Sequence, residues 1–281
     1  MRIRRWLGLS LVAFGVVLAG VGPAGAATLD GATIHSTSTG QGPKTVILVH
    51  GWTCDESSWS EQVPALAKKY RVITVDLPGH GKSDPPKDGK FSMDVFAKAV
   101  EAVRAEAGVD RVILAGHSMG SPVVYRYAQL YPTHTAALIL VDGPLFRAED
   151  AKGFIGQTLP KVTGKDGLKG REAMIRGMFS SSTPPALQDR ILKMMLRAPE
   201  ATARGAMSSM ADPEVWNNHV LKVPTLAIFA GTYTGSFLDT TKTYLPDLQF
   251  LNMPGTGHFL MLEKPAEFNQ YVMTFIDRQK S

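Results

Sequence analysis

Short apolar, β-branched runs alternate with helical patterns along most of this chain, and this alternation limits the folds that it can adopt. Six runs are typical of strands buried on both faces: 45–50, 71–76, 111–115, 136–142, 225–230 and 248–253. Helices are expected between or after them at 60–69, 92–107 with Ser92 as N-cap, 119–131, and after Pro265. Asp30-Gly31 predicts the turn of an antiparallel lead-in hairpin over 28–40. The pattern predicts an α/β fold, with a mostly parallel sheet and helices on both faces.

The interval 143–222 interrupts this alternation, because it shows no convincing strand pattern. We expect it to be a mainly helical insertion between two strands of the sheet. Its many methionines fit two interpretations, ordinary core packing or the adaptable roof of an apolar pocket. The predicted domain organisation is therefore a core in two parts, 27–142 and 223–281, with 143–222 as a cap or lid.

The first 26 residues have the pattern of a cleaved export signal. Three arginines precede an uncharged apolar stretch, 6–21, and Ala24-Gly25-Ala26 is a small-residue cleavage site. The stretch is shorter than the roughly 20 residues that a membrane span prefers, so we expect no stable membrane anchor. We expect a protein that is secreted, periplasmic or held in the cell envelope after signal cleavage, whether the route is Sec or twin-arginine.

The net charge of +5 over 281 residues is unevenly distributed. Removing the three arginines of the export signal leaves +2, and the cap, with 12 Lys/Arg and 8 Asp/Glu, accounts for +4. This positive charge either lies on a solvated face of the cap or attracts anionic substrates. No basic run or stripe of aromatic residues indicates nucleic-acid binding. The single cysteine, Cys54, excludes an intramolecular disulfide and is expected to pack as a small apolar residue.

Three short segments carry residues suited to acyl-transfer chemistry. The first, Gly116-His117-Ser118-Met119-Gly120, matches G-x-S-x-G and lies between an expected strand and an expected helix, as a nucleophile elbow requires. In the second, Gly257-His258-Phe259, a histidine follows the last strand, where it can act as a general base near neutral pH. Together these segments predict a serine nucleophile, Ser118, activated by His258.

The third segment, His50-Gly51-Trp52, ends the first apolar run. Acyl transfer creates an oxyanion that needs preorganised N–H donors, and the backbone N–H groups of Trp52 and Met119 are the expected pair. A simple tight turn is the other interpretation of His50-Gly51. No H-x-H or H-E-x-x-H pattern occurs, so no catalytic metal is expected.

In this order, the three segments resemble the α/β-hydrolase superfamily, and the resemblance covers nearly all of the chain after the export signal. It includes the segments 76–83, expected to be a structural strand-to-helix turn, and 257–265. The resemblance implies an eight-stranded sheet, a Ser-His-acid triad, and a helical cap inserted after the sixth strand, and such caps often determine the choice of substrate.

The acid of the triad is where this chain departs from its relatives. Many of them carry G-x-x-D after the seventh strand, but here the segment 231–235 reads GTYTG, and Thr234 cannot carry the charge that stabilises an imidazolium. Asp142, at the end of the preceding strand, is the favoured acid. Asp239, in the following loop, is the alternative, and the absence of a functional acid is a third.

These features predict an exported serine hydrolase without metal or organic cofactor, which acts on a small-molecule ester through an acyl-serine intermediate. The sequence makes no prediction of oligomeric state. Lactones, amides, carbon–carbon substrates and perhydrolysis are alternatives on the same fold. A non-catalytic small-molecule binding protein is the alternative from another class.

Overall fold

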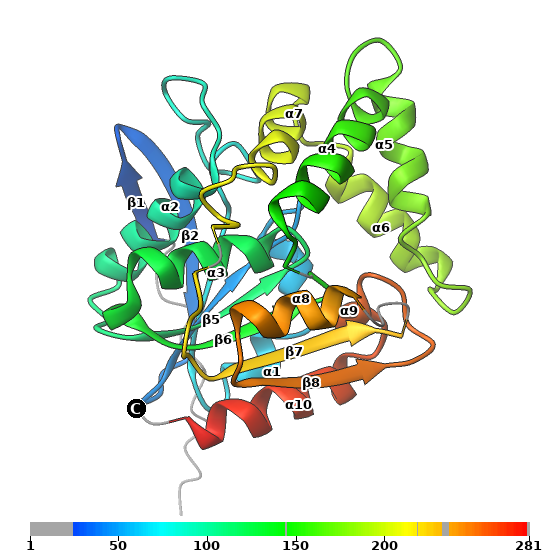
Figure 1. Ribbon diagram of the computed structural model, residues 1–281. Coiled ribbons are helices and arrows are strands. Elements are labelled where there is room, and N and C mark those ends of the chain that lie inside the picture. Colours follow the sequence, from blue (N-terminus) through cyan, green and yellow to red (C-terminus); the bar gives the residue numbers. More distant parts are fainter. Residues whose placement is uncertain (1–24, 144, 218, 232–235, 280–281) are drawn as a thin grey trace, which may run out of the picture.

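The computed structural model describes residues 25–143, 145–217, 219–231 and 236–279. Its centre is an eight-stranded sheet with the order β1-β2-β4-β3-β5-β6-β7-β8 (Figure 1). The strands are β1 (Gly25–Leu29), β2 (Ala32–Thr39), β3 (Thr45–Val49), β4 (Arg71–Val75), β5 (Val112–His117), β6 (Thr135–Val141), β7 (Thr225–Ala230) and β8 (Leu248–Met253). β1–β2 and β2–β4 pair antiparallel, and all other pairs are parallel. The predicted sheet is thereby confirmed.

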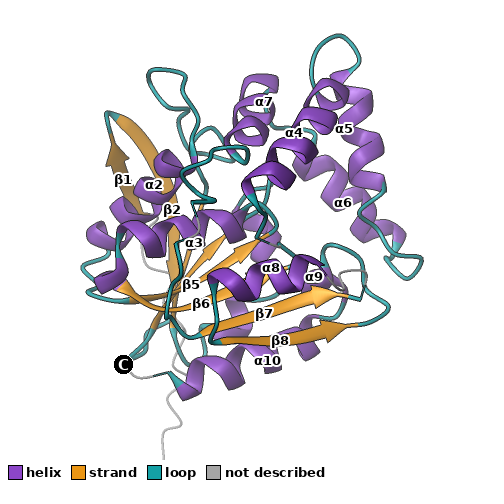
Figure 2. Cartoon of the chain, in the orientation of Figure 1, coloured by secondary structure: helices purple, strands orange, loops and turns teal. Residues whose placement is uncertain are grey.

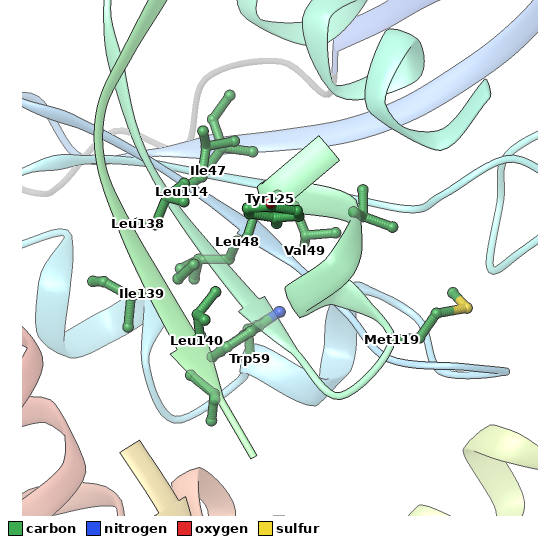
Figure 3. Packing of buried hydrophobic residues seen from close by; sticks show 14 of the residues in the cluster. Ile47, Leu48, Val49, Trp59, Leu114, Met119, Tyr125, Leu138, Ile139 and Leu140 are labelled. Carbon is green, nitrogen blue, oxygen red and sulfur yellow. The ribbon is translucent and has the colours of Figure 1, made fainter. Parts of the chain in front are cut away.

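The central strands are apolar on both faces because helices cover both faces of the sheet. α2 (Met93–Glu106), α3 (Gly120–Leu130) and α8 (Ser236–Tyr244) lie on one face. α1 (Val63–Leu66) and α10 (Pro265–Arg278) lie on the other (Figure 1). Every residue of β3 and β7 is buried. Buried side chains of β3, β5 and β6 belong to the same hydrophobic core as Trp59, Tyr125 and Met119 (Figure 3).

Local signals explain where the first elements begin and end. Asp30 and Gly31 both have positive φ, as the turn of the β1–β2 hairpin requires. Ser92 is the N-cap of α2, and its Oγ accepts a hydrogen bond from Val95 N at 3.1 Å.

The helix expected over 60–69 is shorter than predicted. The segment contains a single turn, α1, over Val63–Leu66, and a 3₁₀ helix over Glu56–Trp59 precedes it. Pro64 explains the difference, because proline is tolerated only in the first turn of a helix. A helix that began at Ser60 would have placed it deeper.

The insertion between β6 and β7 forms the predicted helical cap. It contains α4 (Ala148–Val162), α5 (Gly167–Arg176), α6 (Pro185–Met195) and α7 (Glu200–Ser209), which lie beyond the carboxyl ends of the strands (Figure 2). Its described residues include no strand. β6 ends at Val141 and β7 begins at Thr225, so the predicted borders at 142/143 and 222/223 fall between the two strands.

Most of the predicted export signal, residues 1–24, lies outside the described residues. Gly25 and Ala26 belong to β1, so cleavage after Ala26 would shorten this edge strand by two residues. Among the helices of the described part, none is both long and apolar enough to cross a membrane.

Candidate active site

Ser118 occupies a sharp turn between β5 and α3. Its φ of 53° is left-handed, which is uncommon for a residue with a side chain and is typical of a nucleophile elbow. A Cβ on Gly116 would lie 2.1 Å from Gly120 O, and one on Gly120 would lie 2.5 Å from Val49 O. Both positions therefore require glycine. Ser118 N donates to Val141 O at 2.8 Å, which fixes the turn against β6.

Asp142 and His258 form a close pair beside this turn. His258 Nδ1 lies 2.6 Å from Asp142 Oδ2, and the other carboxylate oxygen accepts a hydrogen bond from Ala230 N at 2.8 Å. Asp142 is 2% exposed, so its carboxylate is held by β7 and by the imidazole rather than by solvent. With Nδ1 engaged, Nε2 is the ring nitrogen left to exchange a proton with a hydroxyl.

Asp239 does not share this environment. It is exposed on α8, and within the described part of the chain the His258 imidazole bonds to Asp142 alone. The segment 232–235, in which Thr234 stands where a G-x-x-D pattern would have its aspartate, lies outside the described residues.

Ser118 and His258 line one cavity of about 500 Å³ between the sheet and the cap. Asp142, Trp52 and Met119 line it as well. Ser118 Oγ forms no hydrogen bond with another described residue, a common situation in catalytic sites without substrate. The cavity therefore brings all of the favoured site residues to one place.

An oxyanion hole requires backbone N–H groups that are not already engaged, and those of Trp52 and Met119 meet this condition. Neither donates a hydrogen bond to an acceptor in the described part of the chain, so both remain available to a ligand. Met119 directly precedes α3, and Trp52 follows β3 at the same edge of the sheet. The Trp52 indole Nε1 donates to Ala203 O of α7 at 2.8 Å, which links this loop to the cap.

His117 contributes to the site in a way that the sequence did not reveal. The ring is fully buried, and its Nε2 lies 2.8 Å from His258 O. Burial and the neighbouring His258 lower the pKa of His117 well below its usual value, so the ring is neutral and donates to this carbonyl. His117 thus supports the loop that carries His258. Its place inside G-x-S-x-G gave no signal for this contact.

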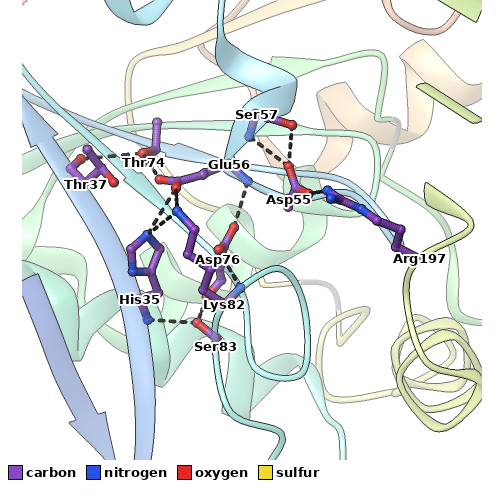
Figure 4. A network of polar contacts seen from close by, with 10 residues as sticks. All are labelled: His35, Thr37, Asp55, Glu56, Ser57, Thr74, Asp76, Lys82, Ser83 and Arg197. Atoms are coloured by element: carbon purple, nitrogen blue, oxygen red, sulfur yellow. Dashed lines mark hydrogen bonds and ion pairs between the residues drawn. The ribbon is translucent and has the colours of Figure 1, made fainter. Parts of the chain in front are cut away.

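A polar network joins the β3–α1 loop to β2, β4 and the segment 76–83 (Figure 4). His35, Glu56 and Asp76 are the one group of three potential metal ligands among the described residues. The ammonium group of Lys82 already contacts two of the three, since Lys82 Nζ lies 2.9 Å from Glu56 Oε1 and 3.3 Å from His35 Nε2. Burial raises the pKa of Glu56, but hydrogen bonds from Lys82 and neighbouring groups outweigh it and lower the pKa to about 2.

The same network holds the segment 76–83 in place. The Asp76 carboxylate accepts hydrogen bonds from Glu56 N at 2.7 Å and Lys82 N at 2.9 Å. Gly81 allows this approach, because a Cβ there would lie 2.2 Å from Asp76 Oδ2. Cys54, on the neighbouring loop, is buried at the edge of the cavity, and burial raises the pKa of its thiol.

Comparisons with known proteins agree with this architecture. A family model described as alpha/beta hydrolase fold matches residues 44–176. A 2-hydroxy-6-oxononadienedioate/2-hydroxy-6-oxononatrienedioate hydrolase of Paraburkholderia phymatum is 28% identical over 278 residues, covering 88% of this chain and 93% of that protein. The dihydrolipoyllysine-residue acetyltransferase component of the acetoin cleaving system of Pseudomonas putida is 26% identical over 246 residues, 84% of this chain and 64% of that protein. A solved thermophilic esterase from Thermogutta terrifontis has a TM-score of 0.77 at 26% identity, covering 92% of this chain and 99% of the esterase.

Proposed function

We propose, from the premise that this chain is a hydrolase with the α/β-hydrolase fold, that it cleaves carboxylic esters with Ser118 as the nucleophile. One observation carries the proposal. The Asp142–His258 pair, 2.6 Å apart, shares a single cavity with a serine on a strained elbow. This is the arrangement that a nucleophilic serine needs, namely a base beside it and an acid that orients the base.

The chemistry proceeds in two stages. Ser118 Oγ attacks the acyl carbonyl while His258 Nε2 takes its proton, and Asp142 stabilises the imidazolium. The N–H groups of Trp52 and Met119 stabilise the oxyanion of the tetrahedral intermediate. His258 returns the proton to the leaving alcohol, and an acyl-serine remains. Water, deprotonated by His258, then attacks the acyl carbon, and collapse of the second tetrahedral intermediate releases the acid and restores Ser118.

The walls of the cavity favour an apolar acyl group. They include six methionines and four phenylalanines, listed here with their elements or loops: Met119 (before α3), Met174 (α5), Met178 (after α5), Met195 (α6), Met207 (α7), Met210 (after α7), Phe146 (before α4), Phe154 (α4), Phe179 (after α5) and Phe259 (before α9, Leu260–Glu263). No lysine or arginine belongs to the described lining, so the positive excess of the cap lies outside it. A dianionic substrate, as the name of the Paraburkholderia relative implies, would lose hydration there without gaining a cationic partner.

A neutral ester with an apolar acyl chain is accordingly the favoured substrate class. Lactones, amides, carbon–carbon substrates and perhydrolysis use the same groups and are the alternatives within this fold. A binding protein that keeps the cavity without turnover is the alternative from another class.

A fluorophosphonate probe and p-nitrophenyl esters test the proposal together. We expect the wild-type protein to be labelled at Ser118 and to turn over esters, with Ser118→Ala unlabelled and at least about 10⁵-fold slower. A folded wild-type protein that is neither labelled nor active would identify a binding protein. Labelling without ester turnover would instead favour an amide, lactone or carbon–carbon substrate.

We also propose that the protein is exported and that residues 1–26 are its signal. The three arginines, the apolar stretch 6–21 and the small residues before the cleavage point support this.

A further inference from the structure

The loop between α5 and α6 of the cap lies directly on the loop that carries His258. His258 N donates to Met178 O at 2.9 Å, and Ser182 Oγ donates to Gly255 O at 2.7 Å. The backbones are so close that a Cβ on Gly257 would lie 2.6 Å from Met178 O and 2.7 Å from Ser180 N. Two segments about 80 residues apart in sequence therefore meet at a tight backbone contact.

Glu263, at the end of α9 (Leu260–Glu263), lies at the centre of this contact. One carboxylate oxygen accepts hydrogen bonds from Gly257 N and Ser180 Oγ, and the other accepts one from Thr183 Oγ1, all at 3.0 Å. The neighbouring Lys264 Nζ instead donates to Pro254 O at 2.9 Å. Glu263 thus binds one donor on the histidine loop and two on the cap. Hydrogen bonds to an ionised carboxylate are about twice as strong as neutral ones.

We propose that Glu263 is a positioning residue that couples the cap to His258, a role that rests on the proposed serine-hydrolase function. The carboxylate holds the cap loop 178–183 and the loop 254–259 as one unit. The placement of the cap over the cavity then fixes the backbone from which the imidazole reaches Ser118. His117 supports the same loop from the sheet side through His258 O, so the histidine is held between the sheet and the cap.

Hydrogen exchange and kinetics test this coupling in the full chain. We expect Glu263→Ala to raise amide exchange in both segments, 178–184 and 255–262. The kcat should fall about tenfold with KM within about twofold of wild type, because a misplaced base affects the chemical step rather than substrate binding. Labelling of Ser118 by a fluorophosphonate should slow by the same factor. Glu263→Gln, which keeps an acceptor oxygen, should recover most of the loss.

The cap side of the contact supplies the decisive variant. Ser180→Ala combined with Thr183→Val removes both cap donors to Glu263, together with hydrogen bonds inside the cap loop, and leaves the sequence of the histidine loop unchanged. We expect it to raise exchange in 255–262 as well. Glu267 is a carboxylate on α10 that bonds only to Tyr271 among the described residues. Glu267→Gln is therefore the matched control, and we expect it to change neither hydrogen exchange nor kcat. If Glu263→Ala fails to fold, the double variant and Glu263→Gln still decide the question.

The outcomes separate this proposal from the proposed function. If the double variant leaves 255–262 protected, or if Glu263→Ala increases exchange without lowering kcat, Glu263 serves its own loop only and the coupling is refuted. If wild-type protein is neither labelled nor active, the hydrolase function fails. The exchange experiment then still shows whether the two loops are coupled.

Discussion

Ser118 and Asp142 stand at equivalent places on neighbouring parallel strands. In the register of β5 and β6, His117 is opposite Val141, so the next residue of each strand is Ser118 and Asp142. Both have left-handed backbones, with φ of 53° and 45°, which turn their side chains away from the course of the strand. The strand register therefore explains why Asp142, which bonds to His258, lies beside Ser118.

Substitution of the two candidate acids distinguishes them directly. We expect Asp142→Asn to lower kcat by about 10⁴-fold, because a neutral amide neither fixes the imidazole tautomer nor stabilises the imidazolium. Asp239→Asn, the matched control on the exposed surface of α8, should stay within about twofold of wild type. Ester hydrolysis at pH 8 measures both. A reversed result would assign the acid to Asp239.

At the scale of elements, buried strands were more predictable than the contacts between loops. All six apolar runs form strands, and Ser92 caps α2 as expected, because burial and capping leave local signals. Five of the strands are largely buried, as predicted, but the prediction of burial on both faces is wrong for β8, an edge strand in which only Met253 is buried. By contrast, α1 is a single turn where the sequence predicted a longer helix, and no sequence pattern predicted α8 or α9. Glu263 and His117 gain their roles only when segments distant in sequence meet, so no local pattern reveals them.

Two adjacent methionines of α6 allow a test of whether the cap methionines serve as core packing or as the roof of the cavity. Met195 lines the cavity, whereas the adjacent Met194, also buried, accepts a hydrogen bond from Ser57 Oγ at 3.5 Å and is not among the cavity-lining residues. We expect Met195→Ala to raise kcat/KM for esters longer by about two carbons roughly tenfold relative to short ones, since the removed side chain leaves room for methylene groups.

Met194→Ala is the control for this experiment. This variant should lower the folding stability by about 2–5 kcal/mol and leave the chain-length preference unchanged. A series of p-nitrophenyl esters of increasing acyl length gives the comparison. Equal profiles for the two variants would assign the methionines to core packing alone.

At the scale of the whole molecule, three buried histidines should make the folding stability depend on pH. His50, His80 and His117 are each at most 1% exposed. Burial lowers the pKa of all three, to about 3 for His80, and for His80 and His117 a neighbouring histidine lowers it further. Their rings contact one another or the site, with 5.0 Å between the centroids of His50 and His80 and 4.7 Å between His117 and His258. A protonated ring in this core would carry a charge without hydration.

Folding stability should therefore fall when the pH drops below about 6.5, the usual value of a histidine pKa. Below it the unfolded chain binds protons that the folded chain does not, so each histidine contributes a slope of up to about 1.4 kcal/mol per pH unit. Urea unfolding between pH 7 and pH 5 measures this slope. Glu56 has a lowered pKa of about 2, so its own contribution to stability is lost only at lower pH and does not affect this interval. His80→Gln should flatten the slope by one histidine, and His219→Gln, at an exposed position, should leave it unchanged. A stability independent of pH in this interval would mean that the folded core accepts these protons.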